Sequence, residues 1–250
     1  MIAALRRTFM TAMTLVVFTS SCAYGQLIRY QAAIRSLADG AATFRSVEAL
    51  PALGRDVAAR AFAAGSYSRQ FRIGTDARTV VSRNAEDGII VAIEQATDTK
   101  IWETAWLLTV DCAGGDAIIN DVAFRPDGRL VVGGTFFNTA SLERNQQQPL
   151  SLTGNGRTSF LALADPTGEW LAARSVPGME IRSIAIDNEG AIFVTGPGVL
   201  ARRYSPGFQQ IWNVPQPANT LQAEHIAAGN DRSQPFVCLL YTSPSPRDAS

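Results

Sequence analysis

Short stretches with alternating apolar and polar positions recur along the chain and are separated by turn residues. Val122 and Phe124 alternate with small or polar neighbours ahead of a Pro126-Asp127-Gly128 turn, and Leu130 and Val132 continue the period of two after it. Glycine at the end of such a turn supplies the positive φ that a hairpin needs. The pattern predicts a strand, a tight turn and a second strand over residues 121–134.

The same strand-turn-strand sequence pattern recurs further along the chain. Residues 183–196 align with residues 121–134 without gaps, and Asn188-Glu189-Gly190 fills the turn. A poorer copy covers residues 225–237, and residues 61–67 parallel residues 130–136 with Gly65 in the place of Gly134. Recurrence of one strand-turn-strand unit indicates an internal repeat.

A second element lies between these hairpins and consists of an apolar strand, a turn and a strand that often carries Trp. Its copies are residues 89–93 leading to Trp102, residues 160–163 leading to Trp170, and residues 199–204 leading to Trp212. Four short strands therefore recur as a unit. Their spacing varies because connections such as residues 138–157, which are polar and rich in Gln, are expected to be long loops.

The sequences of these units resemble those of a known class of repeat. Asp165-Pro166-Thr167-Gly168, Gly114-Gly115-Asp116 and the hairpin 184–196 resemble the bacterial β-propeller repeats of exported and cell-surface proteins. The resemblance implies an all-β fold, a β-propeller fragment of about three to four four-stranded blades over residues 26–237. A β-sandwich with regularly spaced hairpins is the alternative, but a sandwich has no need to repeat the same text.

The N-terminus has the pattern of an export signal. Arg6 and Arg7 precede an apolar run over residues 9–18, and Ala23-Tyr24-Gly25 offers small residues to a signal peptidase. We expect residues 1–25 to be a signal peptide and Gln26 to begin the mature protein, which then has no transmembrane helix. Two refinements stay open, a lipid anchor at Cys22 and the twin-arginine export route.

The C-terminal stretch departs from the repeat. Residues 238–248 resemble the conceptual translation of a transposon-based sequencing-library adapter, beginning at Cys238-Leu239-Leu240-Tyr241. A Ser/Pro-rich linker is the ordinary interpretation of such text, but a linker has no reason to begin this way. We expect residues 238–250 to be a non-native tail, with the natural protein longer than this chain and truncated near Val237.

Composition and charge narrow the function classes. The 250 residues include 22 basic and 22 acidic side chains, scattered singly and in pairs, so the sequence does not predict a nucleic-acid partner. Cys112 stands alone in the body of the chain, which predicts a buried apolar side chain and no disulfide framework.

Candidate catalytic and cofactor motifs are weak. His225, the single histidine, begins a predicted strand, and no Gly-x-Ser-x-Gly motif accompanies it. Gly196-Pro197-Gly198 fits a dinucleotide-binding pattern in spacing, but residues 199–204 read as a strand, so no helix N-terminus would face a pyrophosphate. We interpret this segment as a hinge between blades.

Two polar clusters are candidates for ligand binding. Asp116, Asn120 and Asp121 offer oxygen ligands for calcium but lack the tight spacing that wraps a hard cation, so a solvated loop between strands is expected. The Arg202-Arg203 pair is expected to direct one side chain to each face of its strand.

A class of cofactor-binding propeller is the alternative to a scaffold protein without a cofactor. The segment from Ala92 to Trp102 resembles the repeat of quinoprotein (pyrroloquinoline quinone) propellers, although Glu94 and Asp98 depart from its Asp and Gly. In that family the Trp packs between blades and has a structural role. The resemblance therefore implies the propeller fold first, and a bound cofactor only second.

The sequence as a whole predicts an exported binding or scaffold module without catalytic, cofactor or metal residues. It would present loops to a protein or glycan partner, in the periplasm or outside the cell. A quinoprotein-like propeller with a dehydrogenase or assembly role is the alternative function.

Overall fold

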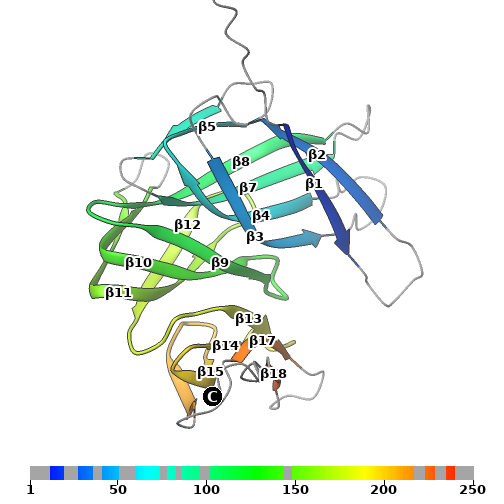
Figure 1. Ribbon diagram of the computed structural model, residues 1–250. Helices are drawn as coiled ribbons and strands as arrows, with labels where there is room; N and C mark the ends of the chain where they lie inside the picture. Colours follow the sequence, from blue (N-terminus) through cyan, green and yellow to red (C-terminus); the bar gives the residue numbers. More distant parts are fainter. Residues whose placement is uncertain are drawn as a thin grey trace, which may run out of the picture.

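The structure is a computed structural model, and it describes residues 12–19, 28–35, 41–50, 60–73, 78–82, 86–95, 102–143, 148–216, 223–228 and 235–239. The regular structure of these residues is entirely β, as the sequence predicts. Figure 1 shows a large curled sheet with the smaller sheets of the C-terminal half below it. In the described part of the chain, no helix is long and apolar enough to cross a membrane.

Consecutive antiparallel strands form three four-stranded units. The first unit contains β3 (Ala41–Leu50), β4 (Arg60–Ser68), β7 (Asp87–Gln95) and β8 (Trp102–Cys112). The second contains β9 (Ala117–Phe124), β10 (Leu130–Leu142), β11 (Leu150–Ala164) and β12 (Trp170–Val176). The third contains β13 (Ser183–Ile186), β14 (Ile192–Gly196), β15 (Val199–Tyr204) and β16 (Gln210–Pro215).

The remaining strands form three hairpins. These are β1 (Ala12–Thr19) with β2 (Ile28–Arg35), β5 (Gln70–Ile73) with β6 (Arg78–Val81), and β17 (Ala223–Ala228) with β18 (Pro235–Leu239). The end of β10 also pairs with β8, at Ala140 and Cys112, which joins the first and second units into one curled sheet of eight strands.

The units stack face to face because successive side chains of a strand point to opposite faces. Val132 and Phe160 face the first unit, where they pack with Phe62 and Trp106. Their neighbours Val131 and Leu161 face the third unit and pack with Ile184 and Ile192. Both faces of the second unit are therefore buried, which explains near-continuous apolar runs such as residues 160–164.

The first strands of successive units lie side by side. β9 contacts β3 and β13, and β13 contacts β17. Three of these strands have a β-bulge opposite their partner, at Arg45 in β3, Asn120 in β9 and Glu224 in β17. One stacking geometry thus recurs along the chain.

The repeated glycines have a common steric cause. A Cβ at Gly65, Gly134 or Gly196 would meet the backbone oxygen of Thr43, Ile118 or Glu180. Thr43 and Ile118 lie two residues ahead of the bulges in β3 and β9, and Glu180 lies three residues ahead of β13. Only glycine lets the second strand approach the first this closely. The glycine spacing noted in the sequence therefore reflects this close approach of strands.

Two loop predictions are wrong. Residues 138–157 are not one long loop, because β10 continues to Leu142 and β11 begins at Leu150. Buried Ala140, Leu142 and Leu152 hold this extension on the core that the first two units share. Pro197 and Gly198 form no hinge between repeats, because they connect β14 and β15 within the third unit.

The two ends of the chain are described in part. Residues 12–19, which overlap the predicted signal peptide, form β1 and pair with β2, while residues 20–27 with Cys22 and the predicted cleavage site lie outside the described residues. β18 extends through Cys238 and Leu239, the first residues of the predicted non-native tail. Leu239 pairs with Ala223, the residue ahead of the β17 bulge, just as Gly65 pairs with Phe44 and Gly134 pairs with Ile119 ahead of their bulges.

We predict that Gly134→Ala destabilises the fold, because its Cβ would collide with the Ile118 carbonyl and lie 2.8 Å from the Phe160 ring. Overpacking of this kind costs about 1–3 kcal/mol. Urea unfolding of the variant checks it, with Gly114→Ala as the matched control, since nothing lies within 4 Å of a Cβ there. Equal midpoints for both variants would show that the close approach is not rigid.

Candidate functional site

Four tight turns share one geometry at one end of the stack, here called the turn end. Their residues are 125–129, 165–169, 187–191 and 205–209, and in each the fourth residue donates its N–H to the carbonyl of the first. The fourth residues are Gly128, Gly168, Gly190 and Phe208, all with positive φ. Asp165 and Asp187 also accept backbone N–H groups within their own turns, which explains the Asp at the start of these motifs.

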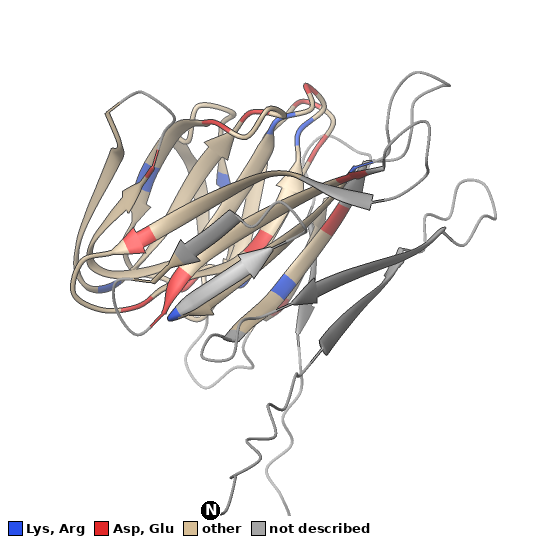
Figure 2. Ribbon diagram, turned by 90° about the horizontal axis from the view of Figure 1, so that it is seen from above, with Lys and Arg blue, Asp and Glu red and all other residues tan. Residues whose placement is uncertain are grey.

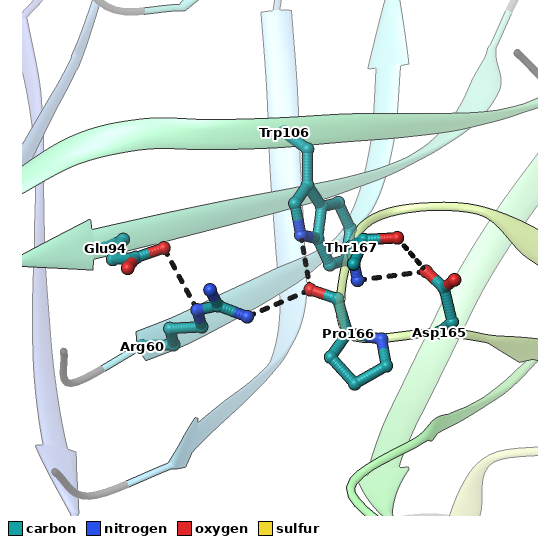
Figure 3. A network of polar contacts seen from close by, with 6 residues as sticks. All are labelled: Arg60, Glu94, Trp106, Asp165, Pro166 and Thr167. Atoms are coloured by element: carbon teal, nitrogen blue, oxygen red, sulfur yellow. Dashed lines mark hydrogen bonds and ion pairs between the residues drawn. The ribbon is translucent and has the colours of Figure 1, made fainter. Parts of the chain in front are cut away.

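The first unit binds the 165–169 turn of the second unit directly (Figure 3). Arg60 Nη1 and Trp106 Nε1 each donate to the Pro166 carbonyl at 3.0 Å, and Glu94 holds the Arg60 guanidinium at 3.0 Å. Gly168 packs on the Trp106 ring so closely that a Cβ would lie 2.5 Å from it. The turn is therefore fixed by a neighbouring unit.

A similar link joins the second and third units. Arg125 donates to the Pro206 carbonyl at 3.3 Å, and Arg174 donates to the Phe208 carbonyl at 2.8 Å. Basic side chains of one unit thus hold turn carbonyls of the next. Much of the polar chemistry at the turn end is engaged in holding the stack together.

A half-buried carboxylate lies where the first strands meet. The Asp121 carboxylate on β9 accepts the Ser46 hydroxyl of β3 at 2.6 Å and the Ile184 N–H of β13 at 2.7 Å. It also accepts the N–H of Val122 at 2.9 Å and a side-chain hydrogen bond from Ser183. One carboxylate therefore links three units.

The contact belongs to a repeated series, which we call the seam. Its positions are Ser46, Asp121 and His225, each directly after the bulge of its first strand, and Ser183, the first residue of β13. Val122 N–H donates to Ser46 Oγ at 3.4 Å, and Ile226 N–H donates to Ser183 Oγ at 3.5 Å. Each seam side chain up to Ser183 thus accepts the N–H that follows the seam position of the next first strand.

Burial raises the pKa of Asp121 above its ordinary value of 3.8. The hydrogen bonds from Ser46, Ile184, Ser183 and Val122 act in the opposite direction, because they stabilise the charged form. Removal from water has the larger effect. Asp121 therefore combines burial with a shifted pKa and contacts to several units.

The predicted solvated loop of Asp116, Asn120 and Asp121 is wrong for the last two residues. Both lie in β9, where the Asn120 side chain donates to the Ile181 carbonyl at 2.8 Å and Asp121 is held in the seam. Asp116 forms an isolated bridge with Glu86. The three side chains do not converge, and the described residues contain no group of three His, Cys, Asp or Glu that could hold a metal ion.

The tryptophans that the sequence treated as equivalent lie in different places. Trp170 is fully buried between the first and second units, and its Nε1 donates to the Thr109 carbonyl at 3.3 Å. Trp212 lies on the face of the third unit that points away from the second unit, beside Phe193. Residues 96–101 of the quinoprotein-like pattern and the side chain of Trp102 lie outside the described residues.

The other single residues are placed as follows. Arg202 bonds the Tyr204 hydroxyl on one face of β15, and Arg203 lies over the Phe193 ring on the other, as alternation predicts. Cys112 is buried, also as predicted, and its Sγ donates to the Phe137 carbonyl at 3.1 Å. His225 is exposed on β17.

The opposite end of the strands, here called the loop end, carries the β10–β11 extension. Phe137 is 40% exposed there, and Arg157 lies opposite it in the ladder and is also exposed. Asn138 and Gly156 both have positive φ, and the Asn138 side chain accepts the Gly156 N–H at 3.0 Å. These contacts fix a bulge that presents Phe137 outward. Figure 2 shows acidic and basic residues interspersed over the described strands.

Comparison with known proteins adds little. No family model matches the chain, and none of the curated proteins is similar enough to count as a relative. A structure of a humanized mutant of the Chaetomium thermophilum Polycomb Repressive Complex 2 bound to the inhibitor GSK343 matches at 11% identity and a TM-score of 0.40. The match covers 94% of this chain and spans 54% of that one, and a likeness this weak carries no argument about fold or function.

We predict that Asp121→Asn changes the pH dependence of stability. Because the folded pKa is raised, the folded protein binds more protons than the unfolded chain between pH 3.8 and the folded pKa. The contribution of this carboxyl to stability is therefore complete below pH 3.8 and is lost as the pH rises through the folded pKa. The asparagine cannot titrate, so its free energy of unfolding should lack this decrease.

Urea unfolding of both proteins from about pH 4 to 7 measures the difference. Ser46→Ala is the control, because it removes one hydrogen bond to the carboxyl but leaves the titrating group in place. Parallel curves for wild type and Asp121→Asn would contradict the assignment of this titration to Asp121.

Proposed function

We propose that this chain is part of an exported β-propeller that binds a protein or glycan partner through its loop end. The observation that supports it most directly is the seam, which repeats one acceptor-to-N–H link between successive first strands. Radially arranged blades need such a repeated contact, because each blade meets its neighbour in the same way. The three units and the β17–β18 hairpin would be consecutive blades.

The distribution of polar contacts favours the loop end as the binding face. At the turn end, the carbonyls of Pro166, Pro206 and Phe208 are held by side chains of a neighbouring unit. At the loop end, the outer face of the β10–β11 extension presents exposed Thr139, Ser151 and Thr153 beside Phe137. An exposed aromatic ring among hydroxyl groups suits both protein and glycan surfaces.

We predict that a photo-crosslinking phenylalanine analogue at position 137 forms an adduct with the partner in cells that export the protein. The same analogue at Ile211, which is 53% exposed on β16, should form none, because β16 belongs to a different sheet from the extension. A glycan array probed with wild type and Phe137→Ala covers a glycan partner, and binding should fall about tenfold or more in the variant. Adducts from position 211 alone, or equal binding by both proteins, would refute the proposed face.

Export gives a separate prediction. The mature protein should begin at Gln26, since signal peptidase would cut after Ala23-Tyr24-Gly25. N-terminal sequencing of the exported product measures this directly. Labelling of the product with palmitate at Cys22 would show that the protein is lipid-anchored and not released. An intact Met1 would contradict export with signal cleavage.

A further inference from the structure

Residues 154–156 form a bulge in the β10–β11 extension. The ladder pairs β10 with β11 up to Phe137 and again from Thr139, so these residues of β11 together lie opposite Asn138. Asn155 at the centre of the bulge is exposed and has a glycine on each side. Its side-chain amide and the backbone N–H that follows it therefore lie in a segment outside the ladder.

This pair of groups can react with each other. Asn155 is the only asparagine in the sequence that a glycine follows. The backbone nitrogen of the following residue can attack the side-chain carbonyl carbon of an asparagine and close a succinimide ring. A new C–N bond forms and the Cγ–Nδ2 bond breaks, so the amide leaves as ammonia with the proton of the attacking N–H. Water then opens either carbonyl of the ring and gives aspartate or isoaspartate.

The surroundings of Gly156 both permit and restrain this attack. Its φ is +67°, and no atom lies within 4 Å of the position that a Cβ would take, so nothing crowds the attacking nitrogen. Its N–H donates to Asn138 Oδ1 at 3.0 Å. The nitrogen must lose this proton to attack, and a hydrogen bond to the N–H stabilises the unreactive form. The Asn138 side chain therefore opposes the reaction that the open bulge allows.

We propose that Asn155 is a site of spontaneous deamidation and that the Asn138 side chain sets its rate. When the hydrogen bond opens, the Gly156 nitrogen attacks, and hydrolysis leaves a carboxylate two residues from exposed Arg157. The isoaspartate product also lengthens the backbone of the bulge by one atom. The charge and shape of the loop end then change as the protein ages. This chemistry belongs to the chain alone, so it can hold or fail independently of the loop-end partner.

Peptide mapping by mass spectrometry tests the proposal on the folded full chain, incubated at mildly alkaline pH. Wild type should accumulate aspartate and isoaspartate at position 155. Asn138→Gly removes the acceptor but tolerates the φ of 59° that Asn138 adopts. Its conversion should be about fivefold faster, the factor that a hydrogen bond of about 1 kcal/mol represents.

Asn138→Asp is the matched control. Aspartate also tolerates positive φ, and its carboxylate can accept the Gly156 N–H in a charge-assisted hydrogen bond. Its conversion should be no faster than that of wild type, whereas a bulge that was merely loosened would speed both variants alike. Asn155→Gln should show almost no conversion, because its longer side chain would have to close a larger ring.

A measurement on wild type alone supports the comparison of variants. The urea-unfolded chain lacks the hydrogen bond from Gly156 to Asn138, so it should convert faster than the folded protein at the same pH. Thermal melting checks that each variant is folded. An Asn155 that stays unmodified in wild type and Asn138→Gly, equal rates in the folded and unfolded chain, or equal acceleration by Asn138→Gly and Asn138→Asp would each overturn the proposal.

Discussion

The arrangement of this chain depends on one half-buried carboxylate between the first strands. Asp121 accepts hydrogen bonds from β3 and β13. Ser183, which also donates to Asp121, accepts the Ile226 N–H of β17. Four strands far apart in the sequence therefore meet on a connected set of hydrogen bonds. A buried carboxylate is costly unless its oxygens are satisfied, and here the donors come from the strands that it joins.

Two sets of polar contacts, at different places along the strands, hold the stack of units together. The seam fixes the first strands, while Arg60, Trp106 and Arg125 hold the turn carbonyls of neighbouring units. Between these levels, both faces of the second unit are buried in apolar cores. This division leaves the loop end less constrained, and the β10–β11 extension there carries the exposed Phe137.

The wrong loop prediction for residues 138–157 has a physical origin in the alternation of side chains along a strand. Polar residues in 138–157 suggested a loop, but a strand with one buried face needs an apolar residue only at alternate positions, and Ala140, Leu142 and Leu152 supply them. The tryptophans were likewise equated by spacing alone. A register shift next to Ala164 turns Trp170 towards the first unit, a change that spacing does not reveal.

By itself the sequence determined the all-β class, the repeating hairpins, the turns and the positions of Gly65, Gly134 and Gly196, because these features depend on local φ and on contacts between adjacent strands. Only the tertiary structure decided the role of Asp121. Its partners Ser46 and Ile184 lie 75 and 63 positions away, and no local pattern marks a carboxyl that will be hydrogen-bonded between units. An acidic residue at a strand start suits solvent equally well, so the stacking of the units alone distinguishes the two.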